Sequence, residues 1–305
     1  MSSPWIAGLR SVDLDVPDLA RAESFYTETW RLQVAARDTG ALYLRGSGSD
    51  HHLLALHAAD ATRLRRVTLR ARSEEALQRV ADAAVSAGGR VLREIGPADD
   101  PAGGVSMLLR DPDGRLFEIV HGDRLHADQA DSNLATQVDD RPLRLAHAVL
   151  NSHDVPASQR FVEQTLGFAL ADRTRIMAFM NCNADHHSLA LADADNNALN
   201  HIAFLMPDLD AVMRGGGRMQ DAGHAIEWGP GRHGPGHNAF NYFIGPFGEV
   251  IEYTADVQQI DDSYRVGQPA DWAWPPGRVD HWGISAAPSA RLKAAQRAVL
   301  FMPSE

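Results

Sequence analysis

Two stretches of the chain decide the fold: LRSVDLDV at residues 9–16 and LRLAHAVL at residues 143–150. Each has the residue pattern of a buried strand and is followed by an aspartate, a proline and a segment with helical spacing. Two more pairs match: DHHLLALHAAD at 50–60 with DHHSLALADAD at 185–195, and RDPDGRLFEIV at 110–120 with GPFGEVIEYT at 245–254. Asp13 and His147 lie 134 residues apart, and the other pairs keep this offset to within one residue. The constant offset predicts an internal duplication.

The duplication divides the 305 residues into two similar domains. We expect a first domain at residues 1–128, a second domain at 141–256 and a C-terminal extension at 257–305, with a polar linker between the domains. Within each copy, the order of strand, helix and short strands occurs twice. Helices are expected at 19–30, 73–85 and 154–166, and the triple glycine at 215–217 weakens the prediction of a fourth helix that begins at residue 209.

The composition excludes several classes of protein. The net charge of −11 disfavours a nucleic-acid partner, because like charges repel. The single cysteine, Cys182, excludes an internal disulfide framework and a cysteine-based zinc site. No apolar run approaches the ~20 residues that span a bilayer, and the N-terminus lacks the pattern of a secretory signal. We therefore expect a cytoplasmic protein with no membrane partner.

The two copies differ at three matched strand positions. The matched pairs, first copy named first, are Asp13 and His147, Arg66 and His201, and Glu118 and Glu252. Only the second copy therefore holds two imidazoles and one carboxylate. This is the ligand set of non-haem Fe(II) oxygenases, which leave positions open for substrate and dioxygen. His147, His201 and Glu252 are therefore the predicted metal ligands.

Other polar residues of the second copy surround these positions. His233 lies in the glycine-rich segment GPGRHGPGH at 229–237, and Tyr242 begins a strand shortly after it. His186 and His187 are expected on an earlier strand, where only one of them can face the metal. His and Tyr side chains exchange protons with phenolic oxygens near neutral pH. His51, His52 and His186 are better interpreted as polar residues that fill the surface or the core, and the alternative for His147 and His201 is that they are ordinary half-buried strand histidines.

At these residues the chain resembles the type I extradiol ring-cleavage dioxygenases of the vicinal oxygen chelate (glyoxalase/bleomycin resistance) superfamily. The family's closing signature is Gly-x-His, an apolar residue and Tyr, then Asp-Pro-x-Gly and a final Glu. Here it runs from Gly231 to Glu252, with two departures: Asn241 is polar and Gly245 replaces the acidic residue. The resemblance covers residues 7–256, and in this family the first domain lacks a metal.

The resemblance implies an α+β fold, with two domains of paired βαβββ modules whose mixed sheets curl into open barrels. It implies Fe(II), with Mn(II) as the alternative, and a catecholic substrate that reacts with O2. His187, His233 and Tyr242 would be the acid–base residues, with His187 on the dioxygen side. The family also implies an assembly of identical chains and a role in the degradation of aromatic compounds.

Two alternative functions stay open at the level of sequence. A glyoxalase, isomerase or metallo-hydrolase of the same superfamily would share the fold and the metal, and a non-catalytic ligand-binding protein would share the fold alone. The identity of the catechol is also open, among monocyclic catechols, bicyclic diols and more hydroxylated rings. In the extension, Trp272, Trp274 and Trp282 are expected to serve as packing anchors rather than ligand contacts.

Overall fold

The computed structural model describes residues 3–127 and 140–303, so most of the expected linker lies outside the described residues. The first half comprises β1 (Ile6–Val16), α1 (Leu19–Ser24), the π-helical segment η1 (Phe25–Thr29), β2 (Gln33–Asp38), β3 (Ala41–Arg45), β4 (Leu54–Ala58), β5 (Arg63–Ala71), α2 (Glu74–Ser86), β6 (Arg90–Pro97), β7 (Val105–Arg110) and β8 (Leu116–His121). The second half comprises β9 (Arg144–Ser152), α3 (Val155–Leu166), β10 (Ala169–Arg173), β11 (Met177–Asn181), β12 (Leu189–Asp193), β13 (Ala198–Leu205), α4 (Leu209–Asp221), β14 (Trp228–Arg232), β15 (Ala239–Ile244) and β16 (Val250–Ala255). The expected extension adds α5 (Ala290–Ala295) and β17 (Val299–Leu300).

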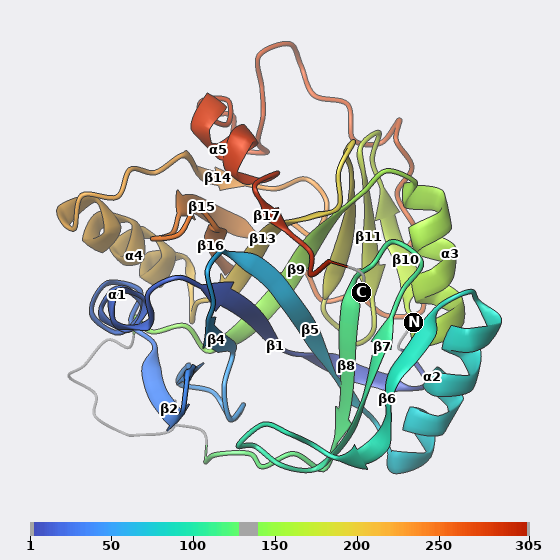
Figure 1. Cartoon of the computed structure of the whole chain (residues 1–305). Coiled ribbons are helices and arrows are strands. Elements are labelled where there is room, and N and C mark those ends of the chain that lie inside the picture. Colours follow the sequence, from blue (N-terminus) through green and yellow to red (C-terminus); the bar gives the residue numbers. More distant parts are fainter. Residues whose placement is uncertain (1–2, 128–139, 304–305) are drawn as a thin grey trace.

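Each half forms one mixed sheet from two βαβββ modules (Figure 1). The strand orders are β2-β3-β4-β1-β5-β8-β7-β6 and β10-β11-β12-β9-β13-β16-β15-β14, so the two halves repeat the same topology. The first strands of the two modules pair antiparallel in the middle of each sheet, β1 with β5 and β9 with β13. The predicted α+β fold with paired modules is confirmed, although the sheets stay open and are not strongly curled.

Local signals account for the helix boundaries. The Asp154 carboxylate caps α3 by accepting a hydrogen bond from the Ala157 amide, and the helix ends at Gly167 in the left-handed conformation. Helix α4 instead continues through the triple glycine to Asp221, which the sequence did not favour. The reason is packing: the helix lies so close to the Tyr253 ring that a Cβ atom at residue 215 would come within 2.8 Å of it, so the close contact requires glycine there.

The two halves share one hydrophobic core, and aromatic residues join them. The Trp30 indole stacks on the Tyr253 ring with centroids 3.6 Å apart, and the Tyr253 hydroxyl donates to the Trp30 carbonyl at 2.8 Å. Four of the helices lie in two groups at opposite sides of the sheets, α2 with α3 and α1 with α4, and α5 lies apart from both groups (Figure 1). No helix in the described part of the chain is both long and apolar enough to cross a membrane.

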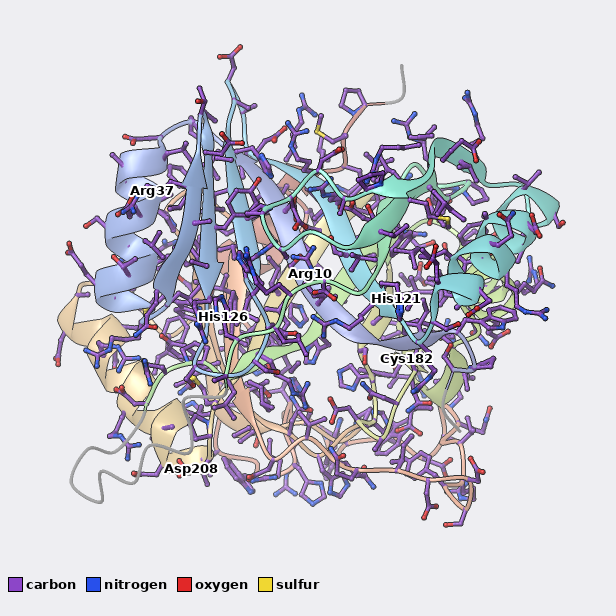
Figure 2. All side chains as sticks on the ribbon, turned by 90° about the horizontal axis from the view of Figure 1, so that it is seen from below. Arg10, Arg37, His121, His126, Cys182 and Asp208 are labelled. Carbon is purple, nitrogen blue, oxygen red and sulfur yellow. The ribbon has the colours of Figure 1, made fainter. Side chains whose placement is uncertain are left out.

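In the first half, an ion-pair cluster occupies the place of the predicted metal ligands. The Arg66 guanidinium lies 2.9 Å from Asp13 Oδ2 and 3.0 Å from Glu118 Oε2. Both carboxylate side chains are almost fully buried. Burial is the largest influence and alone would raise the pKa of Asp13, but the Arg66 charge and the contact with His57 together hold this pKa well below its usual range. A second buried cation, Arg10, pairs with Asp100 inside the fold (Figure 2).

Replacing Arg66 with methionine should destabilise the first half, because it removes the cation that two buried carboxylates share. His57 beside Asp13 and Arg93 beside Glu118 are then the remaining ion-pair partners. The expected loss is about 3–5 kcal/mol of unfolding free energy at pH 7, measured by urea denaturation. The depressed pKa of Asp13 adds stability above the unfolded value of about 3.9, so the difference should shrink as the pH falls below it. An unchanged urea midpoint at pH 7 would refute this role.

Candidate metal centre and the surrounding cavity

Strand register places the predicted metal ligands on one face of the second sheet. Ala203 on β13 lies opposite His147 on β9 and beside Glu252 on β16. His201 precedes Ala203 by two residues and therefore points to the same face. Tyr242 on β15 pairs with Glu252, which extends the row to a fourth strand. The alternation of side chains along strands thus gathers residues that are far apart in the sequence.

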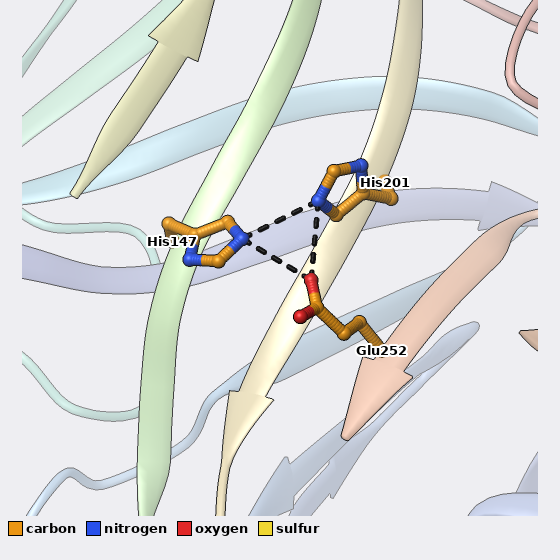
Figure 3. Close-up of side chains that lie close together, drawn as sticks. All are labelled: His147, His201 and Glu252. Atoms are coloured by element: carbon orange, nitrogen blue, oxygen red, sulfur yellow. Dashed lines mark hydrogen bonds and ion pairs between the residues drawn. The ribbon is translucent and has the colours of Figure 1, made fainter. Parts of the chain in front are cut away.

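The three ligand side chains converge on one point (Figure 3). His147 Nε2 and His201 Nε2 lie 3.3 Å apart, and they lie 3.2 and 3.3 Å from Glu252 Oε2. All three residues are buried, and Glu252 Oε2 has no hydrogen-bond partner among the described residues. One divalent cation among the three atoms would bind both nitrogens and supply that missing partner. The residues therefore fit a metal ion that is bound by two imidazoles and one carboxylate and that keeps its other coordination positions open.

The protonation states at this point suit a cation. Burial lowers the pKa of His201 to about 4, although Glu252 opposes this shift, so the ring is neutral at pH 7. Burial alone would raise the pKa of Glu252, but its contacts with the neighbouring histidines hold it well below the usual range. The carboxylate is therefore ionised, and a neutral ring can offer a lone pair to a metal.

His233 and Tyr242 form a pair on one side of the metal centre. His233 Nε2 lies 3.0 Å from the Tyr242 hydroxyl, which is itself 3.5 Å from His201 Nε2. Burial, followed by the charge of Glu252, raises the pKa of Tyr242 well above its ordinary value. Tyr242 therefore stays protonated and can donate a hydrogen bond to an oxygen atom beside the metal centre.

His187 lies on another side, where its ring centroid is 4.3 Å from that of His147. His186 points away, and its Nε2 lies 2.7 Å from the Asp172 carboxylate. The two rings are linked through their Nδ1 atoms at 3.0 Å, so His186 also positions His187. Both histidines lie in the bend just before β12, so the prediction that they sit on a strand is wrong. The bend nevertheless aims the two rings in different directions.

A cavity of about 750 Å³ opens from the metal centre. Its walls are mostly apolar, with Met177 and Phe179 from β11 and with Trp228 from β14. Trp272 and Trp274 of the extension also line it, and both rings pack closely against Gly234. The C-terminal extension is therefore part of the site.

Some site residues were missed by the sequence analysis. Asn238 donates from Nδ2 to Thr254 Oγ1 at 2.7 Å and approaches Glu252 Oε1 at 3.4 Å, so it helps to orient the carboxylate. Asp172 anchors His186 as described. The only sequence signal for Asn238 was its place directly after the glycine-rich segment 229–237, which carries His233.

Comparisons with known proteins agree with this geometry. Residues 144–253 match the family model described as the Glyoxalase/Bleomycin resistance protein/Dioxygenase superfamily, and residues 11–120 match a glyoxalase-like domain model. The Mn(II)-bound glyoxalase from Novosphingobium aromaticivorans superposes with a TM-score of 0.84 at 30% identity, covering 100% of this chain and 96% of that one.

The chain is also similar to two curated proteins. Metapyrocatechase 2 from Cupriavidus necator is 31% identical over 210 residues, which are 63% of this chain and 62% of that protein. The chain thus spans less than two thirds of this relative's length. A manganese-dependent 2,3-dihydroxybiphenyl 1,2-dioxygenase from Geobacillus genomosp. 3 is 21% identical over 79% of this chain and 82% of that protein.

Substitution of His201 by alanine should remove most of the bound metal while the fold is kept, because two ligands hold a divalent ion far more weakly than three. Elemental analysis after loading with Fe(II) under nitrogen measures the metal content, and circular dichroism checks the fold. Glu118→Gln is the matched control, since its half lacks both imidazoles and its metal content should equal that of the wild type. Full occupancy in the His201 variant would disprove the assignment.

Proposed function

Because the chain belongs to the type I extradiol dioxygenases of the glyoxalase/bleomycin resistance protein/dioxygenase superfamily, we propose that it cleaves the aromatic ring of a catechol. The observation that carries the proposal is the convergence of His147, His201 and Glu252 beside an apolar cavity. Cleavage falls outside the diol, between a hydroxyl-bearing carbon and its neighbour. This assigns the enzyme to the degradation of aromatic compounds.

The proposed reaction needs no external reductant. One carbon–carbon bond of the ring breaks, and both atoms of O2 enter the product. One atom ends in a carboxylate, and the other ends in an aldehyde or ketone. The ring is oxidised by four electrons and dioxygen accepts the same four, so the substrates balance each other.

We propose Fe(II) as the resident metal, with Mn(II) as the alternative. Two imidazoles and one carboxylate suit both ions. Among the relatives, one dioxygenase is named as manganese-dependent and another as iron-dependent. When bound, the metal supplies Lewis-acid and redox chemistry next to the cavity. The chain's own part is to hold it by three residues, which leaves the remaining positions to the reactants.

The acid–base residues divide the proton transfers between two sides of the metal centre. Tyr242, held in its protonated form, orients the substrate by donating a hydrogen bond to a diol oxygen. His233, 3.0 Å from that hydroxyl, accepts a proton from the diol side. His187, on another side, starts neutral because burial depresses its pKa, so its ring accepts a proton there during the reaction and then gives it up. The apolar cavity walls exclude water from these transfers.

The cavity favours a catechol that carries a bulky apolar group. A volume of about 750 Å³ lies toward the upper part of the usual range for ligand sites, whereas a single catechol ring has eight heavy atoms. The aromatic walls from Phe179, Trp228 and Trp274 suit a second ring. We therefore propose an aryl-substituted or fused-ring catechol as the preferred substrate.

A glyoxalase-like isomerase is the second candidate, favoured by the glyoxalase that superposes over the whole chain at 30% identity. An isomerase moves protons on its substrate and consumes no dioxygen. The two candidates therefore differ in an observable quantity, the uptake of oxygen. His187, His233 and Tyr242 around the metal centre support the dioxygenase.

The Fe(II)-loaded protein should consume one O2 per catechol and form a yellow ring-opened product. Mass spectrometry under ¹⁸O2 should show both labelled atoms in the product. An aryl-substituted catechol should give a higher kcat/KM than catechol itself if the cavity selects size. A dicarboxylic acid, formed by cleavage between the hydroxyl groups, would contradict the proposal, as would turnover without oxygen uptake.

His187→Asn should lower kcat by a factor on the order of 10²–10⁴ while iron and substrate still bind, since a general acid or base contributes that much. His186→Asn is the control on the neighbouring residue and should have a much smaller effect, because His186 acts only through His187. Single-turnover kinetics under saturating oxygen separate these outcomes. The reverse ranking would transfer the role to His186.

A further inference from the structure

The C-terminal end of the chain lies against the strand that carries His201. Strand β17 pairs with the start of β13, where Val299 lies opposite Leu199. Between α5 and β17, the carbonyl groups of Gln296 and Arg297 accept hydrogen bonds from asparagine side chains of the second half. We call residues 290–300 the C-terminal hairpin. These contacts place it within two side chains of a predicted metal ligand.

Two asparagines connect the hairpin to His201. Asn151 Nδ2 donates to the Gln296 carbonyl at 2.9 Å, and Asn200 Nδ2 donates to Asn151 Oδ1 at 2.9 Å. Asn200 Oδ1 then lies 2.9 Å from His201 Nδ1. Asn151 is 1% exposed, so water does not compete for its amide. We call these contacts the asparagine relay.

The backbone carbonyl of Gln296, at the end of the relay away from His201, determines the direction of every hydrogen bond in it. A backbone carbonyl can only accept, so the Gln296 carbonyl must receive an N–H of Asn151. The Asn151 oxygen therefore faces Asn200 and must receive an N–H in turn. This leaves the Asn200 oxygen toward His201, where it can only accept. The proton of a neutral His201 ring is thus placed on Nδ1, and the Nε2 lone pair faces Glu252 and His147.

A second carbonyl sets the same direction independently. Asn196 Nδ2 donates to the Arg297 carbonyl at 2.8 Å, so its oxygen is free to accept. Asn151 Nδ2 lies 3.2 Å from that oxygen. The Asn151 amide group is therefore held by two acceptors on the hairpin side, and the opposite orientation would bring oxygen against oxygen.

We propose that the C-terminal hairpin, through Asn151 and Asn200, fixes the tautomer of His201 and thereby sets how tightly the metal is held. A ring protonated on Nδ1 offers its Nε2 lone pair to a metal, whereas the other tautomer offers an N–H that excludes it. Asn151 and Asn200 are positioning residues, because they act through His201. The inference rests on the metal site of the proposed function and is independent of ring cleavage.

Mn(II) titration of the metal-free protein by calorimetry tests the relay at Asn200. Asn200→Leu removes the acceptor and should raise the dissociation constant for Mn(II) by about 10–100-fold. This is the usual effect of losing the hydrogen-bond partner of a metal-ligating histidine. Asn200→Asp keeps an acceptor for the Nδ1 proton, although it gives up the N–H that Asn151 Oδ1 receives, and it should bind Mn(II) more tightly than Asn200→Leu. If Asn200 only supported the fold, the two variants would not differ in their Mn(II) dissociation constants in this order.

Asn151→Leu tests the connection to the hairpin. It keeps Asn200 in place but removes the partner that orients its amide, so Mn(II) binding should weaken, although less than in Asn200→Leu. Asn197→Leu is the matched control: this half-buried neighbour donates to the Asp113 carbonyl at 2.7 Å, outside the relay, and its Mn(II) affinity should equal that of the wild type. Thermal melting of each metal-free variant confirms that the fold is kept.

Three outcomes would overturn the inference. Wild-type affinity in Asn200→Leu would show that the tautomer needs no acceptor, and wild-type affinity in Asn151→Leu would show that the hairpin plays no part. In both cases the proposed function stands, because the wild type still binds the metal. Failure of the wild type itself to bind Mn(II) or Fe(II) would overturn the proposed function and this inference together.

Discussion

The buried carboxylate of Glu252 is the constraint on which the second half depends. An ionised carboxylate without hydrogen bonds to one of its oxygens is costly in a protein interior, and it persists only where a cation or a charged partner compensates it. His147 and His201 supply nitrogens at hydrogen-bond distance, but a shared cation satisfies all three groups at once. The sheet register, the cavity and the acid–base residues are arranged around this point.

The first half also has a buried carboxylate, and an arginine side chain supplies the positive charge that compensates it. Glu118 occupies the position of Glu252, and the Arg66 guanidinium takes the place of the metal between it and Asp13. The duplicated fold thus keeps a buried carboxylate in both copies and compensates it differently in each. An arginine occupies this place in the first half, whereas in the second half the matched place lies between two imidazoles and one carboxylate.

Much of this site was predictable from sequence, because duplication preserves register: His147, His201 and Glu252 stood out against their matched residues. Contacts between segments that are distant in sequence were not predictable. Asn151 and Asn200 have no unusual spacing, and their role depends on where the C-terminal hairpin docks. Similarly, helix α4 survives its three glycines because packing outweighs propensity.

We expect the second half to hold one metal ion and the first half to hold none. Anomalous X-ray diffraction at the iron absorption edge, from crystals loaded with Fe(II) under nitrogen, locates the metal directly. We expect one peak per chain, between His147 Nε2, His201 Nε2 and the Glu252 carboxylate, and no peak near Arg66. A peak at another set of residues, or crystals of the loaded protein with no iron between these three side chains, would contradict it.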